Sequence, residues 1–148
     1  MPKQSPPVFK KLSITASRAF LRTSSVGRLA FLNRGRVDIQ PVHYAARADW
    51  LFLRSAEGSK LTALAHNPYV AFEVDDVRDP LNWKSVVVRG TMYLLDAAER
   101  QRAVRALREV MPETLTPDDP TPERDVVYGI HIDEVSGRIA ESRALKRR

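Results

Sequence analysis

The chain has 148 residues, of which 43% are hydrophobic and 28% are charged, and its formal net charge is +6. This length suits one domain around one hydrophobic core, and this composition is typical of a globular protein and not of a disordered one. The absence of cysteine excludes disulfides, thiolate metal sites and thiol catalysis. Because His43, His66 and His131 are too scattered to form a ligand pair, we expect no metal site.

The positive charge lies mostly near the two ends of the chain, which indicates solvated basic tails. Phe31, Phe52 and Phe72 fall on strand positions expected to be buried, so they do not form the stacking platform of a single-strand binder. No run approaches the roughly 18 apolar residues of a membrane span. The N-terminus also lacks a hydrophobic signal core. We therefore expect a cytoplasmic protein with no membrane partner, and the sequence argues against nucleic acid as a partner.

The N-terminal part of the chain predicts an arm, a helix and a hairpin. Prolines within residues 1–12 favour a flexible arm ahead of the domain itself, which we place at residues 13–140. Apolar residues at helical spacing predict a short helix over 14–25. Alternating apolar residues predict strands over 26–32 and 37–45, and the turn residues between them join the two strands as a hairpin.

The middle of the chain predicts three more strands and a second helix. A strand over 50–54 is expected to continue the hairpin as an antiparallel meander. The elements after it are a short helix over 60–66, a strand over 70–74 and a charged loop over 75–82. The strand over 83–95 is the longest, and Gly90 within it indicates a bulge or a close backbone approach.

The C-terminal part predicts a helix, a loop and a last strand. Capping-box spacing after Asp96 predicts an amphipathic helix that ends where prolines crowd residues 112–122, which we expect to form a surface loop. The last strand is predicted over 126–132, with a turn at 136–138 and a basic tail at 141–148. Six strands with two or three helices and no repeat predict a small barrel with helices at its ends.

The segment Trp50-Leu-Phe-Leu-Arg-Ser-Ala-Glu-Gly-Ser-Lys-Leu has the chemistry of a phosphate cradle. Arg54 offers a planar fork of donors, Ser55 and Ser59 offer hydroxyls, Gly58 allows a close backbone approach, and Lys60 places a charge at a helix N-terminus. Strand-turn-helix segments of this composition are also common as plain connections. The cradle alone therefore leaves both interpretations open.

Five segments in order carry a resemblance to a known family. They are Val26-Gly-Arg-Leu-Ala-Phe, Pro41-Val-His-Tyr, the cradle, Asn67-Pro-Tyr-Val-Ala-Phe-Glu-Val-Asp75 and Trp83-Lys-Ser-Val-Val-Val-Arg-Gly90. Together they resemble the pyridoxamine 5'-phosphate oxidase-like split-barrel flavoproteins, and most of all the branch that contains the nitroimidazole-resistance proteins. The resemblance covers roughly residues 26–95, with a weaker echo in 126–139. It implies a mainly β fold with some α, namely a six-stranded antiparallel split β-barrel with two or three flanking helices.

The resemblance also implies a cofactor, FMN, bound at the interface of a homodimer. Arg54, Ser55, Ser59 and Lys60 match the residues that hold the 5'-phosphate. Pro41, Val42, His43 and Tyr44 match the strand whose backbone lies along the isoalloxazine ring. Trp83, Lys84 and Ser85 match a strand start that reaches the flavin from the partner subunit. For His43 the alternative is an exposed strand histidine, and for Trp83 it is interface packing.

The function implied is an oxidoreductase that passes electrons from a reduced nicotinamide to a small acceptor such as a nitroaromatic or a quinone. Because the flavin performs the redox chemistry, the sequence names no catalytic side chain. The alternatives are a flavin-binding carrier or sensor without turnover, a relative that binds the deazaflavin F420, and a nucleic-acid-binding barrel. Other relatives with this barrel bind haem. This sequence has no histidine in an evident position to be an axial haem ligand.

The C-terminus argues against vitamin B6 oxidation. True pyridoxamine phosphate oxidases have a longer C-terminal region whose arginine and histidine hold the substrate phosphate. This chain ends instead in Glu141-Ser-Arg-Ala-Leu-Lys-Arg-Arg148. The sequence therefore points to a cofactor more clearly than to a substrate.

Overall fold

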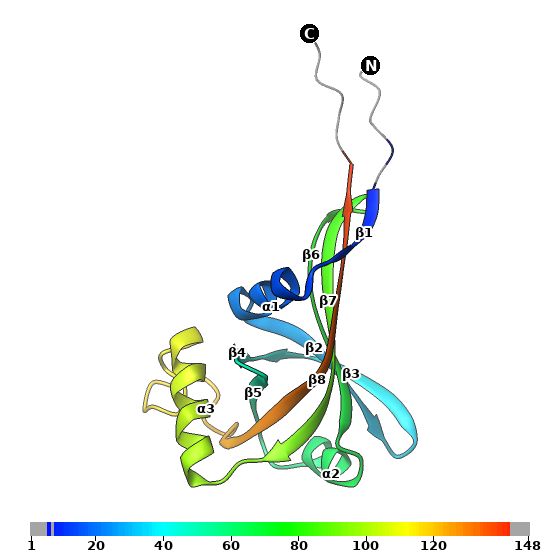
Figure 1. Ribbon diagram of the computed structural model, residues 1–148. Coiled ribbons are helices and arrows are strands. Elements are labelled where there is room, and N and C mark those ends of the chain that lie inside the picture. The colour runs from blue at the N-terminus through cyan, green and yellow to red at the C-terminus, as the bar shows by residue number, and fades with distance from the viewer. Residues whose placement is uncertain (1–5, 7, 143–148) are drawn as a thin grey trace.

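A computed structural model describes residue 6 and residues 8–142, and antiparallel β-structure dominates it (Figure 1). The elements are β1 (Val8–Leu12), α1 (Ile14–Thr23), β2 (Val26–Asn33), β3 (Arg36–His43), β4 (Ala45–Arg47), β5 (Trp50–Ser55), α2 (Ser59–His66), β6 (Tyr69–Asp79), β7 (Asn82–Leu94), α3 (Ala97–Val110) and β8 (Val126–Glu141). The eight strands form one sheet in the order β3-β2-β6-β7-β8-β5-β4, with β1 paired to β8. In the described part of the chain no ladder joins β3 to β4, so the barrel is split. The predicted fold class is confirmed, with eight strands in place of six.

The two additional strands are β4 and β1. The predicted strand over 37–45 breaks at Tyr44, whose hydroxyl donates to the carbonyl of Leu21 at 2.7 Å and whose side chain is fully buried. The residues after this break form the short strand β4. The other additional strand, β1, lies within the expected arm of residues 1–12, because the long β8 offers it a backbone edge from Gly137 to Glu141.

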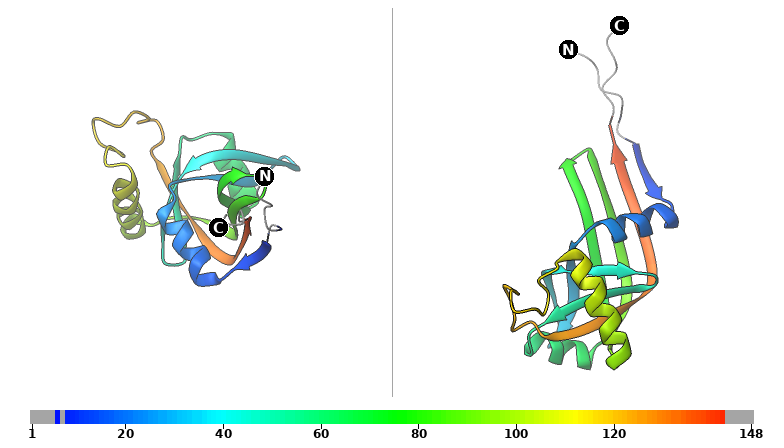
Figure 2. Two further views of the ribbon diagram at one scale, coloured as in Figure 1. Left: turned by 90° about the horizontal axis from the view of Figure 1, so that it is seen from above. Right: turned by 90° about the vertical axis from the view of Figure 1, so that its left-hand side faces the viewer.

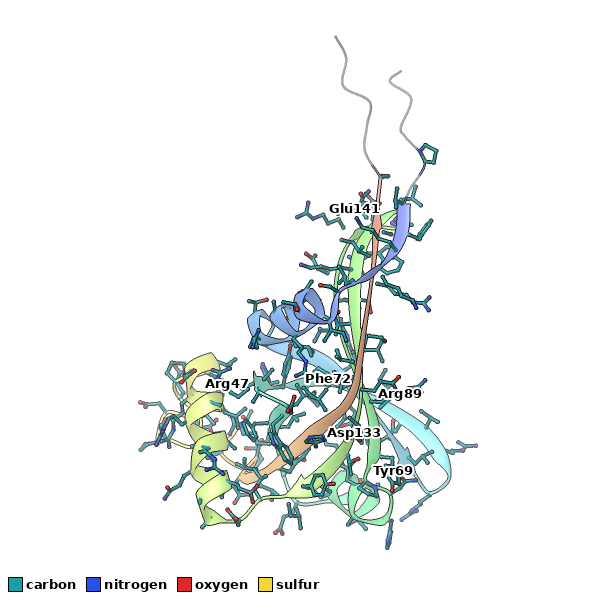
Figure 3. All side chains as sticks on the ribbon, in the orientation of Figure 1. Arg47, Tyr69, Phe72, Arg89, Asp133 and Glu141 are labelled. Atoms are coloured by element: carbon teal, nitrogen blue, oxygen red, sulfur yellow. The ribbon has the colours of Figure 1, made fainter. Side chains whose placement is uncertain are left out.

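The strands β6, β7, β8 and β1 extend beyond the barrel as a projecting ribbon (Figures 1 and 2). β6 and β7 remain paired as far as Asp79 and Asn82, so the predicted charged loop over 75–82 is wrong. The turn is tight because a carboxylate oxygen of Asp79 accepts from the N–H of Leu81 at 2.8 Å. The predicted turn at 136–138 is also wrong, since these residues continue β8 through the ribbon to Glu141, labelled in Figure 3. The predicted basic tail beyond Ser142 lies outside the described residues.

The pairing of β5 differs from the predicted meander. β5 pairs with β4 and with residues 126–131 of β8, and not with β3. β4 and β5 form a hairpin at one end of the sheet, and β2 and β3 form the hairpin at the other end. The predicted bulge at Gly90 is confirmed by a shift in the β7–β8 register between Arg89 and Gly90.

The three helices cover different parts of the barrel (Figure 1). α1 is capped by the Ser13 hydroxyl, which accepts from the N–H of Ala16 at 3.0 Å. α3 begins with the predicted capping box, in which Asp96 accepts from the N–H of Glu99 at 2.8 Å and Glu99 accepts from the N–H of Asp96 at 3.1 Å. α2 starts directly after β5, which places Lys60 beside the end of that strand. No helix among the described residues combines the length and apolar character needed to cross a membrane.

Candidate functional site

A cleft of about 290 Å³ lies between the end of β3, the end of β5, the start of α2 and the loop that follows α3. Its lining residues are Gln40, Pro41, Val42, His43, Arg54, Ser55, Ala56, Lys60, Met111, Pro120, Thr121 and Arg124. The cleft therefore unites two predicted parts of the site that are distant in sequence, the segment of β3 from Pro41 to His43 and the cradle. It also adds a third part, the loop over residues 111–125.

The electrostatics of the cleft are one-sided. Lys60 and Arg124 both line it, and among the residues that the structure describes no aspartate or glutamate does. Within the described part of the chain, neither cation forms an ion pair. Burial lowers the pKa of Lys60, and the positive charge of Arg124 lowers it further. Two cations in one cleft make its chemistry suitable for an anion.

Arg54, predicted to hold phosphate, has a different partner. Its two terminal nitrogens donate to the two carboxylate oxygens of Asp119 at 2.5 and 3.0 Å. The Arg54 side chain is 7% exposed and that of Asp119 is 0% exposed. This bidentate pair is buried and neutralises the arginine, so Arg54 adds little free positive charge to the cleft that it lines.

Arg54 also organises the loop that carries Asp119. Its terminal nitrogens donate to the Thr121 hydroxyl at 3.0 Å and to the carbonyl of Arg124 at 3.3 Å. Asp119 in turn accepts from the N–H of Leu115 at 2.7 Å and from the N–H of Thr121 at 2.9 Å. We call this set of contacts the Arg54–Asp119 clasp. It fixes a proline-rich segment with no helix or strand against the end of β5.

The other predicted cradle and strand residues divide between the cleft and the core. Pro41 and His43 are exposed along the cleft, and Val42 is nearly buried in it. Ser55 lines the cleft, with its hydroxyl donating to the carbonyl of Ala56 at 3.0 Å. Ser59 is exposed at the first position of α2 but is not among the lining residues.

Tyr44, the last residue of the segment whose backbone is predicted to lie along the ring, does not line the cleft, and its side chain is buried in the core. It packs edge-on against Phe72 at 4.7 Å between ring centroids, in the centre of the barrel, where Figure 3 labels Phe72. Burial raises the pKa of the Tyr44 phenol beyond the usual range of tyrosine. Its side chain supports the core and is not available to a ligand in the cleft.

Trp83 and Lys84 lie apart from this cleft. They line a second cleft of about 340 Å³ on the ribbon, together with residues of β6 and β8. The Trp83 indole donates to the carbonyl of Pro80 at 3.1 Å, and the Lys84 ammonium lies 4.3 Å from the centre of the Phe20 ring. The Ser85 hydroxyl donates to Glu73 at 2.8 Å. One copy of the chain therefore does not bring these three residues to the cradle.

Sequence reasoning missed Asp119 and Arg124. The segment that carries them was correctly predicted to be a loop, and its only further signal was length, because loops of more than about 12 residues are often functional. Nothing in the sequence pairs Asp119 with Arg54, 65 positions earlier. Among the described residues no group of three or more metal-ligating side chains is present.

The Arg54–Asp119 clasp predicts a specific acid response. Hydrogen bonds from Arg54 hold the pKa of the Asp119 carboxyl well below its usual range. A carboxylate with a lowered folded-state pKa stabilises the fold above its unfolded pKa of about 3.9, and this contribution is lost as the pH falls below that value. We expect Asp119→Asn to be less stable than the wild type at pH 6, with a smaller difference at pH 3. Urea unfolding at both values measures this, and an equal difference at both would contradict it.

Residues 13–139 match the sequence profile of the pyridoxamine 5'-phosphate oxidase family. This match spans most of the chain, and the split barrel described above agrees with it. The chain belongs to this family.

Solved structures of similar proteins support the family's fold. A FAD-binding protein from Mesorhizobium loti is 28% identical, covers 90% of this chain and 99% of its own, and superposes with a TM-score of 0.76. The FAD-binding protein from Mycobacterium smegmatis is also 28% identical, covers 88% of this chain and 98% of its own, and gives a TM-score of 0.68. A putative 5-nitroimidazole antibiotic resistance protein from Bacteroides thetaiotaomicron shares the fold. It is 18% identical, covers 97% of this chain and 95% of its own, and gives a TM-score of 0.69.

Proposed function

We propose that this protein binds a flavin nucleotide, FMN, in the cleft between β3, β5 and α2. One observation carries the proposal. The fold brings the strand end at Pro41, Val42 and His43 to the same cleft as two unpaired cations, Lys60 and Arg124. An extended strand suits a flat ring laid along it, and the cations suit a phosphate at the end of a short chain.

The residues present fit the chemistry of a flavin nucleotide. The anionic end of the ligand meets Lys60, Arg124 and the Ser55 hydroxyl, and no carboxylate from residues 8–142 lines the cleft to repel it. The apolar side finds Val42 and Met111. The flavin-binding descriptions of the two proteins at 28% identity support the same class of ligand, although both name FAD.

The separation of the predicted site residues supports a second copy of the chain at the site. Trp83 and Lys84 line a cleft on the ribbon, whereas the cradle lines the cleft between β3, β5 and α2. Within one subunit the two sets of residues therefore do not meet. We propose a homodimer in which the partner covers the ring, with Trp83, Lys84 and Ser85 at its edge. Exposed apolar residues on the ribbon, including Phe9 at 61% and Val77 at 62%, support an interface there.

The proposed activity is an oxidoreductase that transfers electrons from a reduced nicotinamide to a small acceptor such as a nitroaromatic or a quinone. A bound flavin supplies the two-electron redox chemistry. The chain's own residues bind the phosphate, orient the ring along β3 and exclude water from its covered face. None of them is required to exchange a proton with the substrate.

Absorbance spectroscopy tests the cofactor proposal. We expect the purified protein, mixed with FMN and passed through a desalting column, to retain a flavin band at about one flavin per chain. Parallel samples with FAD and F420 establish which of the three is preferred. Anaerobic reduced nicotinamide then separates an oxidoreductase, whose band bleaches, from a carrier or sensor, whose band persists. A protein that retains none of the three would overturn the proposal.

Lys60→Gln is expected to weaken FMN binding by about 10- to 100-fold, because a charge-assisted contact contributes roughly 1.5 to 3 kcal/mol. Quenching of flavin fluorescence on titration measures the affinity. Arg36→Gln is the control, since it removes an equal charge from the exposed start of β3, outside the cleft and away from the ribbon. Equal affinity of the Lys60 variant and the wild type would sink the assignment of Lys60.

A further inference from the structure

The Arg54–Asp119 clasp determines which cations are free to bind the phosphate of the proposed flavin nucleotide. Both terminal nitrogens of Arg54 already donate to loop atoms, namely the Asp119 carboxylate, Thr121 and the Arg124 carbonyl. A phosphate could take the same fork only by displacing a buried carboxylate. Such a displacement would leave Asp119 charged and without its main partner in a site where its side chain is 0% exposed. The fork of Arg54 is therefore committed to the loop.

Arg124, unlike Arg54, has a guanidinium that forms no ion pair with a described residue. Its backbone is held at two points, because its N–H donates to the carbonyl of Thr121 at 3.1 Å and its carbonyl accepts from Arg54 at 3.3 Å. Its residue is exposed, it lines the cleft, and no described carboxylate lies within ion-pair distance of its guanidinium. A fixed backbone with a free planar fork suits recognition of phosphate, since guanidinium matches two phosphate oxygens at once.

Lys60 and Arg124 face the same space. Both line the cleft, where burial and then the positive charge of Arg124 lower the pKa of Lys60. The two cations come from segments 64 residues apart, and the clasp is what holds the second one in place.

We propose that Arg124 is a phosphate-binding residue of the cofactor site, where it acts together with Lys60, and that Arg54 is a positioning residue that acts through the clasp. This inference rests on the proposed function and deepens it. It predicts that the cradle of the β5–α2 turn is incomplete by itself and is finished by a loop that arrives from α3. Arg124 and Lys60 recognise the phosphate group of the flavin nucleotide, whereas the ring lies along β3.

A comparison of FMN with riboflavin tests the proposal, because riboflavin has the same ring without the phosphate. We expect Arg124→Gln to weaken FMN binding by about tenfold and to leave riboflavin affinity unchanged. Arg124→Lys should restore part of the loss. Arg36→Gln removes an equal charge from the exposed start of β3, outside the cleft, and should match the wild type. Fluorescence titration with each ligand measures the affinities of the wild type and the three variants.

The outcomes separate the two proposals. A wild type that binds neither FMN nor riboflavin overturns the proposed function. A wild type that binds FMN, with Arg124→Gln binding it equally well, overturns only the role of Arg124. Loss of FMN and riboflavin together would also overturn it, because it would indicate a general change in the cleft and not a lost phosphate contact.

A double-mutant cycle tests the positioning role of Arg54. Arg54→Lys keeps the charge but cannot make the bidentate pair, and we expect it to weaken FMN binding in the wild type but not further in Arg124→Gln. Additive losses would mean that Arg54 contacts the phosphate directly and would overturn the positioning role. If Arg54→Lys does not fold, Thr121→Val replaces it in the cycle, since it removes one clasp contact at the edge of the cleft.

Discussion

Asp119→Asn is expected to lower the melting temperature by about 10 °C. The reason lies with Arg54, whose side chain is 7% exposed and whose counter-ion is the Asp119 carboxylate. Asparagine fills the same volume but carries no charge, and its amide nitrogen cannot accept from a guanidinium. A buried arginine is then left without its counter-ion, which is among the most destabilising changes that one substitution can make.

The neighbouring residue supplies the control for this experiment. Asp118→Asn makes the same chemical change one position earlier, where the residue is exposed and the carboxylate has no described hydrogen-bond partner. We expect its melting temperature to stay within about 2 °C of the wild type, as is usual for surface substitutions. Thermal unfolding followed by circular dichroism measures both variants. Equal melting temperatures for the two variants would show that the clasp does not stabilise the loop.

The local elements of the fold were predictable because their signals are local. Alternation of apolar residues located β2, β6 and the barrel part of β7 and β8, and the capping-box spacing located the start of α3. These patterns depend on residues within a few positions of one another. The same holds for the bulge at Gly90, where a residue without a side chain stands in a long strand.

Two of the errors, the predicted loop over 75–82 and the predicted turn at 136–138, fall in the ribbon. In the ribbon, β6, β7 and β8 continue past the barrel, so their side chains no longer alternate between a buried and an exposed face. The charged residues after Val74 therefore predicted a loop, and Gly137 predicted a turn. The structure shows Gly137 in the middle of β8, where its Cβ would lie 2.3 Å from the Ser17 hydroxyl oxygen. Glycine is required there by close packing and not by a turn.

The candidate site was predictable in part for the same reason. The residues of the cradle are contiguous in sequence, so their chemistry was visible, and the resemblance to a family added the strand at Pro41 to His43. The Arg54–Asp119 clasp was not visible, because it joins residues 65 positions apart through a loop without periodicity. An arginine at a strand end looks alike in sequence whether its partner is a ligand or a buried aspartate.

Gly27→Ala is expected to reduce the free energy of unfolding by roughly 3 kcal/mol, the upper part of the range for overpacked cores. A Cβ at this position of β2 would lie 2.2 Å from the Phe72 ring and 2.8 Å from the Glu73 carbonyl oxygen. The ring cannot retreat, because Phe72 is 1% exposed and packs against Tyr44. The strand itself must therefore shift.

Gly35→Ala separates this steric effect from backbone strain. Gly35 has a φ of +77° and nothing within 4 Å of its ideal Cβ, so alanine there tests the left-handed conformation alone. That conformation costs an alanine roughly 1 to 2 kcal/mol, less than the expected cost at Gly27. Urea unfolding with unchanged slopes measures both variants. A smaller loss at Gly27 than at Gly35 would mean that β2 and Phe72 adjust easily.

The effect of Gly27→Ala should extend to the cofactor site. Gly27 lies opposite Val42 in the β2–β3 register, and Val42 lines the cleft. A shift of β2 away from Phe72 therefore moves the strand along which we place the flavin ring. We expect Gly27→Ala to weaken riboflavin and FMN binding by similar factors, at a temperature where the variant is folded. This pattern differs from that of Arg124→Gln, which should affect FMN alone, so the two variants together distinguish the contribution of the strand from that of the phosphate site.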